Sequence, residues 1–182
     1  MILACFLTAL QPARYFYVSH MTSFLKSFFT FLNRDFTGRT WERSQNHPYF
    51  GEMIYFGDKN LSKCYWEGEV SHKSLTAPIG VTMAGTPAGP TPTEEEFCRN
   101  IISDLDALFE KCRTAFEPIF VQWAKEKMPA NWRESFKLDG FQIPKDGNLN
   151  SPWEVCYFAE PTGHYFIAQF ENGKVKNVAV DG

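Results

Sequence analysis

The chain has 182 residues, a length that fits one domain with a buried core. Aromatic residues make up 16% of it, and a core rich in such large side chains requires no disulfide or metal to stabilise it. The net charge of −3 argues against the clustered positive charge that nucleic-acid binding requires, so we expect no nucleic acid among the partners.

The N-terminus begins with an apolar run at residues 2–10. This run is far shorter than the roughly 20 residues of a membrane span, and the first basic residue, Arg14, follows it instead of preceding it as in a signal peptide. We therefore predict that residues 1–21 are an N-terminal arm or a start-site extension. Residues 22–182 are predicted to form a single α+β domain, with no membrane span.

Residues 22–33 have the apolar spacing of a short amphipathic helix. A membrane-surface helix would need a basic polar face, and this one offers only Lys26. We expect the apolar stripe to pack on the domain, while a partner helix or a homo-oligomer interface is the alternative use of the same surface. The stripe consists of Phe24, Leu25, Phe28, Phe29 and Leu32.

Three strands are predicted over residues 49–56, 62–70 and 78–83, after a polar excursion at residues 34–48. The turn residues at 57–60 indicate that the first two strands pair antiparallel. The Gly/Pro-rich loop at 85–92 has the position of a phosphate-binding loop, but it lacks the Gly-Lys-Ser/Thr sequence and contains three prolines without N–H donors. We interpret it as a stiff connector or an exposed recognition loop.

A long helix is predicted to begin at the acidic stretch Thr93 to Glu96, which resembles a capping box, and to extend toward Met128. Such a helix of 35 residues would be about 50 Å long, more than the ~40 Å width of a domain of this size. Pro118 lies inside it, so we expect a kink or a restart at that residue. Pro129 is expected to end the helix.

The C-terminal part predicts strands. A short edge strand is expected at 138–143, ended by Pro144, and a three-stranded meander at 153–158, 165–170 and 175–180. Asn172-Gly173 between the last two runs is the strongest short hairpin signal. The predicted fold is therefore α+β: a mixed, mainly antiparallel sheet of N-terminal strands and the meander, packed against a long, Pro-kinked helix.

The five cysteines have no regular spacing and are expected to be buried thiols in a reducing, cytoplasmic compartment. No metal-ligand spacing is present, and no cofactor is predicted. A site assembled in space from dispersed polar residues is the remaining route to catalysis or ligand binding. Its candidates are His47, Asp58, His72 and His164.

Aromatic residues on the predicted strands are the second set of candidates. On an exposed sheet face they would form a platform for binding another protein, whereas facing the helix they would be core. They are Tyr55, Tyr65, Trp66, Trp153, Tyr157 and Tyr165.

In layout, the chain looks like immunity-type inhibitors, which are acidic single domains with a mixed sheet and one or two helices. That resemblance covers no specific motif. The favoured hypothesis is a small soluble, non-catalytic protein–protein interaction module, immunity- or adaptor-like, whose partner is another protein. The alternative is a small hydrolase or ligand-binding domain that uses the dispersed histidines and acids.

Overall fold

The structure is a computed structural model that describes the backbone of residues 39–182 and the side chains of residues 43–182. Its strands are β1 (Arg39–His47), β2 (Gly51–Asp58), β3 (Tyr65–Val70), β4 (Ile79–Ala84), β5 (Phe136–Ile143), β6 (Trp153–Ala159), β7 (His164–Glu171) and β8 (Lys174–Asp181). The helices are α2 (Pro92–Ser103) and α3 (Leu105–Ala124), with the short 3-10 turns η2 (Leu61–Lys63) and η3 (Trp132–Glu134).

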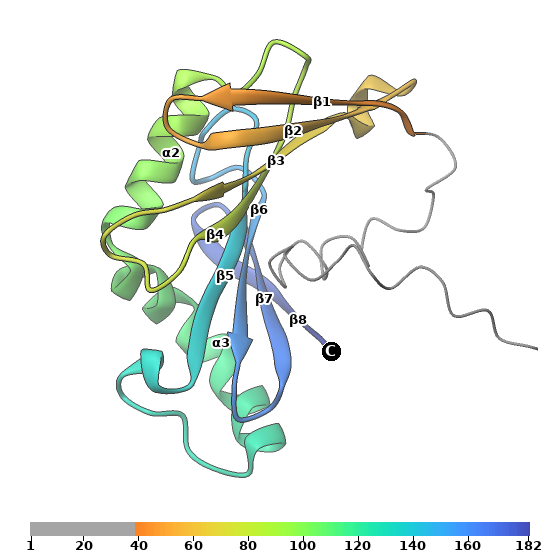
Figure 1. Ribbon diagram of the computed structural model, residues 1–182. Coiled ribbons are helices and arrows are strands. Elements are labelled where there is room, and N and C mark those ends of the chain that lie inside the picture. Colours follow the sequence, from red (N-terminus) through yellow and green to blue (C-terminus); the bar gives the residue numbers. More distant parts are fainter. Residues whose placement is uncertain (1–38) are drawn as a thin grey trace, which may run out of the picture.

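The eight strands form one curved sheet in chain order, from β1 at one edge to β8 at the other (Figure 1). Every neighbouring pair is antiparallel except β4 and β5, which run parallel. Parallel strands require a long crossover connection, and the chain between β4 and β5 supplies it as α2 and α3. The predicted α+β class with a mixed, mainly antiparallel sheet is confirmed.

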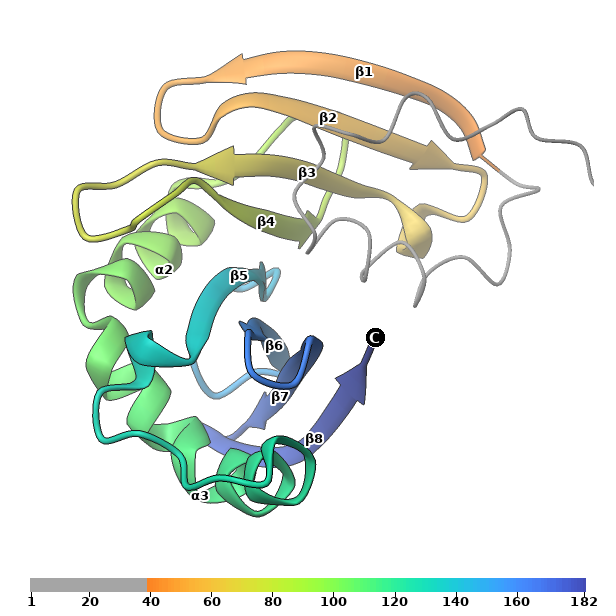
Figure 2. The same cartoon turned by 60° about the horizontal axis from the view of Figure 1, so that its bottom comes forward.

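Both helices lie on the same side of the sheet (Figure 2), which we call the helix face. Their buried residues belong to one hydrophobic core together with alternate residues of the strands, such as Tyr55 on β2 and Val81 on β4. Because successive strand residues point to opposite faces, the residues between these core positions belong to the other side of the sheet. We call that side the second face.

The helix-face core is built from aromatic rings around Phe109 of α3. The Phe109 ring stacks on Trp132 with centroids 4.9 Å apart, and it meets Tyr157 edge-on at 5.2 Å and Phe136 at 5.1 Å. Aromatic pairs in such geometries contribute about 0.5–1.5 kcal/mol each beyond their buried area. The high aromatic content of the chain is therefore used for packing the two helices on the sheet.

Two predictions about strands are wrong. The polar excursion ends in a strand, β1, which pairs with β2 from Arg39 opposite Asp58 to His47 opposite Gly51. Its sequence escaped detection because an edge strand, with a neighbour on one side only, needs little apolar character. The strand at Phe136–Ile143 is central, between β4 and β6, and is not an edge strand. Pro144 follows it directly, as expected.

The helical region is divided at Asp104 and not at Pro118. Asp104 ends α2 and caps α3 by accepting the Ala107 N–H at 2.9 Å, whereas α3 continues through Pro118 to Ala124. The first helix also begins earlier than predicted, because Thr91 is the N-cap and forms the capping box with Glu94. Pro92 at the start of the helix lacks an N–H that would have remained unbonded there in any case.

The three-stranded C-terminal meander is confirmed, since β6 pairs with β7 and β7 with β8, all antiparallel. Asn172 and Gly173 both have positive φ angles, 54° and 70°, as a type I′ turn requires. The hairpin signal therefore identified the turn correctly.

The predicted boundary between residues 21 and 22 and the amphipathic stripe at residues 22–33 lie outside the described residues. Within residues 39–182, no helix is both long enough and apolar enough to cross a membrane.

Candidate functional site

A row of polar side chains crosses the second face of the sheet from β4 to β8. Thr82 lies opposite Gln142 in the parallel pair, and Glu154 lies opposite Gln169, which in turn lies opposite Asn177. The antiparallel register that places Phe141 opposite Val155 brings Gln142 beside Glu154 and so joins the two halves of the row. Five consecutive strands thus each contribute one polar side chain.

Hydrogen bonds hold the C-terminal half of this row in place. Gln169 Nε2 donates to Glu154 Oε1 at 2.8 Å, and Asn177 Nδ2 donates to Gln169 Oε1 at 3.1 Å. Each carboxamide has two N–H donors and an oxygen with two acceptor sites. These two bonds use only part of that capacity, so Gln169 and Asn177 remain able to bond a ligand.

The four members of the row from Gln142 to Asn177 lie in a shallow groove made of two adjoining concavities that share Gln142 and Pro152. Their volumes are about 720 Å³ over the row itself and about 540 Å³ beside it. The first is lined by Gln142, Pro152, Trp153, Glu154, Gln169, Phe170, Glu171, Lys176 and Asn177. The second is lined by Ala84, Gln142, Ile143, Pro144, Lys145, Asp146, Ser151 and Pro152. We call the two together the polar groove.

The loop at 144–152 forms one wall of the polar groove and is held at both ends. At one end Gly147, with φ +61°, approaches α2 so closely that a Cβ would lie 2.6 Å from the Thr93 carbonyl oxygen. At the other end the Asn172 N–H donates to the Asn150 carbonyl at 2.9 Å. Ser151 Oγ also donates to Asp146 Oδ2 at 2.6 Å within the loop. The wall is therefore fixed before any ligand arrives.

The groove lies at the carboxyl ends of β4 and β5, the end of a parallel pair where open α/β sheets bind ligands. The N-terminus of α2 follows β4 and would be an anion site if its N–H groups were free. The Glu94 N–H donates to Thr91 Oγ1 at 3.3 Å, and Glu94 Oε2 accepts the Thr91 N–H at 2.7 Å. Glu94 itself is therefore the anion at this helix end.

The charges along the polar groove nearly cancel. Lys145 and Lys176 face the three carboxylates Asp146, Glu154 and Glu171 in its lining, and Lys176 forms an ion pair with Glu171. Hydrogen bonds from Ser151 and the Asn148 N–H lower the pKa of Asp146. The groove is suited to hydrogen bonding with a polar ligand and has no excess of cations that would attract an anion.

Four of the six aromatic candidates are core residues. Tyr55, Trp66, Trp153 and Tyr157 are each at most 3% exposed and belong to the helix-face core. Trp66 Nε1 donates to the Thr86 carbonyl at 2.9 Å, and Trp153 stacks on Phe170 at 4.3 Å. They do not form an exposed platform, and their role is the core role that the sequence analysis allowed as an alternative.

The other two aromatic candidates, Tyr65 and Tyr165, lie half-buried on the second face. Tyr65 stacks on Phe56 and Tyr165 packs against Phe158, in each case with centroids 5.0 Å apart. Burial raises the pKa of Tyr165 to about 12. Asp139, next to a bulge in β5, lies close enough to Tyr165 to add to that shift.

The dispersed polar candidates His47 and Asp58 are far apart. They lie at opposite ends of the β1–β2 hairpin, seven residue steps along β2 or about 23 Å apart at 3.3 Å per residue. His47 Nδ1 accepts the N–H groups of Tyr49 and Phe50, and Asp58 Oδ1 accepts the Asn60 N–H. Both side chains stabilise local turns.

His72 and His164 are equally local in their contacts. The His72 ring lies 2.7 Å from Ser74 Oγ in the loop before β4, and His164 packs edge-on against Trp123 at 4.3 Å. No contact among the described residues joins two of the four predicted polar candidates. The structure therefore does not assemble the site that the alternative hypothesis requires from them.

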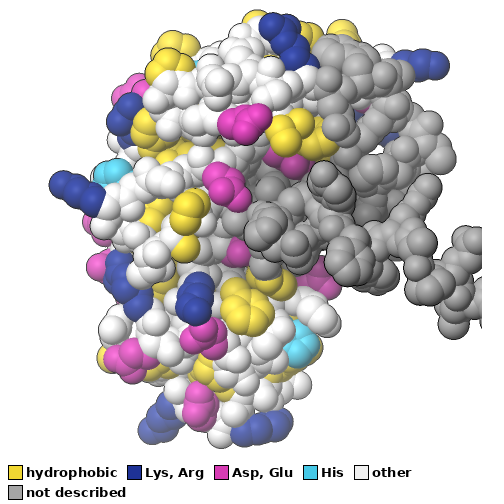
Figure 3. All heavy atoms as spheres, viewed as in Figure 1, with side chains coloured by type: hydrophobic (Ala, Val, Ile, Leu, Met, Phe, Trp, Pro, Cys, Tyr) yellow, Lys and Arg dark blue, Asp and Glu magenta, His cyan; other side chains and the backbone are white. Residues whose placement is uncertain are grey.

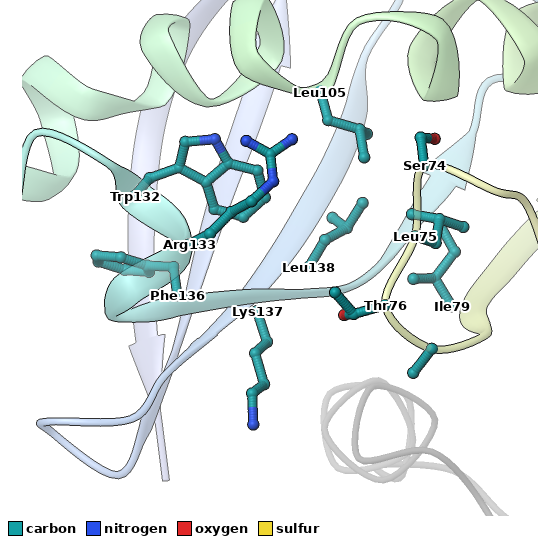
Figure 4. A pocket seen from close by; sticks show the side chains of 11 residues that line it. Ser74, Leu75, Thr76, Ile79, Leu105, Trp132, Arg133, Phe136, Lys137 and Leu138 are labelled. Carbon is teal, nitrogen blue, oxygen red and sulfur yellow. The ribbon is translucent and has the colours of Figure 1, made fainter.

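Ser74 lines a smaller cavity of about 160 Å³ between the loop before β4 and the start of β5 (Figure 4). Leu75, Ile79, Leu105 and Leu138 contribute apolar walls, and Arg133 lies at one side of the cavity next to Trp132. Unlike the polar groove, it sits at the amino ends of β4 and β5. The remaining lining residues are Thr76, Ala77, Trp132, Phe136 and Lys137.

No cluster of three or more metal-ligating side chains exists among residues 43–182. Compared with protein-family models, curated proteins and solved structures, the chain matches none.

The sequence did not single out the polar residues of the groove, Gln142, Glu154, Gln169 and Asn177. Strand alternation alone could have placed Glu154 and Gln169 on the solvent side of their strands, because each falls between core positions. The register that aligns these residues across the strands could not be predicted from the sequence. It depends on the parallel pairing of β4 with β5.

Proposed function

We propose that the protein is a non-catalytic protein-binding module, adaptor- or immunity-like, that holds a polar segment of its partner in the polar groove. The main observation that supports this proposal is the hydrogen-bonded row formed by Glu154, Gln169 and Asn177. Carboxamides can donate to and accept from peptide groups at the same time, so side chains on neighbouring strands offer several hydrogen-bonding positions to a polar segment that lies across them.

The fixed groove wall also supports this function. A partner that binds a preformed surface loses less conformational freedom in the complex than one that must order a loop. The tethers at Gly147 and Asn150 provide such preorganisation. The four described cysteines are buried free thiols, which fits the reducing, cytoplasmic compartment expected for the chain.

The test uses native mass spectrometry of the full chain recovered from its own host, followed by titration of the identified partner. The variant Glu154→Ala with Gln169→Ala removes the centre of the row, and we expect it to weaken partner binding at least tenfold. Glu117→Ala with Glu126→Ala, at exposed positions in and just after α3, is the matched control and should bind like the wild type. Equal binding by the groove variant would contradict the proposal.

A second candidate, the small hydrolase or ligand-binding domain, rests on one observation. Ser74 Oγ lies at the edge of an apolar cavity and 2.7 Å from His72 Nδ1, as in a nucleophile–base pair. The same Nδ1 also lies 3.3 Å from the Ser74 N–H, the geometry of a local turn. Covalent labelling of the wild type by a fluorophosphonate, lost in Ser74→Ala, would favour this candidate over the binding module.

A further inference from the structure

The last strand, β8, forms an open edge of the sheet. It lies at the end of the strand order, and among the described strands it pairs with β7 alone (Figure 1). Apart from that ladder, residues 174–181 make no backbone–backbone hydrogen bond to another described residue. In an edge strand, every second N–H and C=O points away from its neighbour. The outer side of β8 is therefore a row of donors and acceptors to which another strand can be added.

The opposite edge, β1, has features that prevent such an addition. It carries charges at Arg39, Glu42 and Arg43, and its register with β2 shifts between Arg39 and Trp41. Charged side chains and bulges on an edge strand keep other strands from pairing with it. In β8 the register shift precedes Asn177, and residues 177–181 pair regularly with β7. The edge is therefore regular at the C-terminal end of β8.

The side chains of this regular part are divided between the two faces of the sheet. Val178 and Val180 are half-buried and pack against the helix-face core. Asn177, Ala179 and Asp181 lie on the second face, and only the last of them is charged. β-Branched residues on a half-exposed strand favour packing against a neighbouring strand. The composition of residues 177–181 thus permits pairing on the outer side.

An exposed aromatic ring lies beside the same end of β8. Trp123 of α3 is 45% exposed and packs edge-on against His164 at 4.3 Å. His164 in turn lies so close to Gly182, just after β8, that a Cβ there would be 2.8 Å from His164 Cδ2. Tryptophan is enriched in protein–protein interfaces. Backbone hydrogen-bonding groups and apolar surface are therefore available at one place.

The charges of β8 fit a second copy of the same strand. Lys174 and Lys176 lie near its beginning, and Asp181 lies at its end. Antiparallel pairing of two copies brings the basic end of one strand toward the acidic end of the other, whereas parallel pairing would place like charges together. In the view of Figure 3, basic and acidic side chains are both spread over the described surface. The charge pattern within β8 is thus the more specific signal.

One register makes two copies of β8 complementary along residues 177–181. A two-fold axis perpendicular to the sheet pairs the strands antiparallel and places one residue opposite its own copy. With Ala179 at that position, Val178 lies opposite Val180 of the second copy. Asn177 then lies opposite its Asp181, and each pair occurs twice. The helix face gains an apolar pair and the second face gains an amide–carboxylate pair, both of which stabilise antiparallel strands.

We propose that the protein self-associates through β8, which pairs antiparallel with β8 of a second copy about Ala179, so that the two sheets join into one. Asn177 uses one N–H for Gln169, and its second N–H donates to Asp181 of the second copy. The contact is small, so the dimer dissociates on dilution. This inference does not depend on the function proposed for the polar groove.

Cysteine cross-linking of the full chain tests the register. Opposed residues of an antiparallel pair have Cα atoms about 4.5–5.5 Å apart, within the range of a disulfide. With oxidised glutathione, we expect Ala179→Cys to form a covalent dimer linked from position 179 to position 179, as identified by peptide mass spectrometry. The matched control is Asn177→Cys, on the same face and more exposed. Its two copies would lie about 13 Å apart along the strands, so it should give no such dimer.

Equal cross-linking of the two variants would indicate random collision and would overturn the proposal, as would the absence of the link in Ala179→Cys. A charge exchange provides a second test without oxidation. Ala179→Arg and Ala179→Glu each place like charges at the axis, so each should raise the dissociation constant of the dimer at least about tenfold.

Analytical ultracentrifugation measures this self-association as a rise in mass above the 20.9 kDa of one chain with concentration. Mixing Ala179→Arg with Ala179→Glu should restore dimers that contain one chain of each, and circular dichroism verifies that both variants are folded. A wild type that stays monomeric at submillimolar concentration would overturn the proposal. A mixture that associates no more than either variant alone would overturn it as well.

Discussion

The two faces of the sheet are built from the same strands and yet differ in side-chain packing and in polarity. The helix face is a continuous aromatic core in which Phe109 contacts Trp132, Phe136 and Tyr157. On the second face, the polar row from Thr82 to Asn177 lies beside a row of mostly small residues that includes Gly80, Gly140 and Cys156. Alternation along a strand therefore lets one sequence encode an aromatic core on one side and a largely polar surface on the other.

The largest difference between the faces is expected in the free energy of unfolding when one aromatic ring is removed from each. Phe109→Ala leaves a cavity within the aromatic core and should lower the free energy of unfolding by about 3–5 kcal/mol. Phe158→Ala removes a half-buried ring from the second face and should cost about 1 kcal/mol. Urea denaturation of both variants measures the difference, and equal losses would contradict the difference in packing between the two faces.

A smaller effect, and one that depends on pH, is expected at Asp139 on the second face. Burial raises the pKa of this carboxyl from 3.8 to about 7, so in the folded protein it holds a proton that the unfolded chain has already released. Stability should therefore fall as pH rises from about 4 to about 7 and stay level above that. Asp139→Asn, which stays neutral, should be more stable than the wild type at pH 8 by about 1–3 kcal/mol.

The same pair of proteins provides the control for Asp139. At pH 4 the folded wild type is protonated at this residue and the unfolded chain is close to its titration midpoint, so the two proteins should then differ in stability by less than about 1 kcal/mol. Two titratable groups interact electrostatically with Asp139, namely Cys156 and Tyr165. Both have raised pKa values and do not titrate in this range. A constant difference between the two proteins at pH 4 and pH 8 would show that the carboxyl is not titrating as described.

The smallest effects should come from two hydroxyl groups, one on each face. Tyr157 Oη in the core and Thr82 Oγ1 on the second face are buried without a hydrogen-bond partner among residues 43–182. Removing a polar group that is already unbonded relieves its desolvation cost, so Tyr157→Phe and Thr82→Val should be neutral or stabilising by up to about 1 kcal/mol. Thermal unfolding of both variants checks this, and a clear loss of stability in either would reveal a bond that its hydroxyl makes.

The parts of the fold that the sequence predicted are those governed by local chemistry. Asn172-Gly173 specifies its turn through two positive φ angles, and the alternation of the last three strands follows from one buried face. The helix cap is Thr91, two residues before the predicted start at Thr93, because Pro92 is well tolerated at the first helical position. The break at Asp104 was missed because Asp is tolerated in helices and only its capping bond to Ala107 marks a new start.

The candidate site was predictable only in part, for a different reason. The rows on the second face are made by cross-strand register, and register is set by pairings between distant segments. Trp66 and Tyr157 could be assigned to the core only once the position of the helices was known. The polar composition of β1 also gave no sign of a strand in the sequence. Its pairing with β2 is visible in the structure, where the Ser44 hydroxyl donates to Glu52 across the hairpin at 2.8 Å.

The single parallel pairing also determines how this chain can fold. Six of the seven strand pairings join neighbours through short turns or loops, so β1 to β4 and β5 to β8 can each assemble from contacts close in sequence. Only the meeting of β4 with β5 must close the long connection at residues 85–135, with the entropic cost that loop closure carries. The folding rate should therefore be set by the encounter that brings Gly80 beside Gly140.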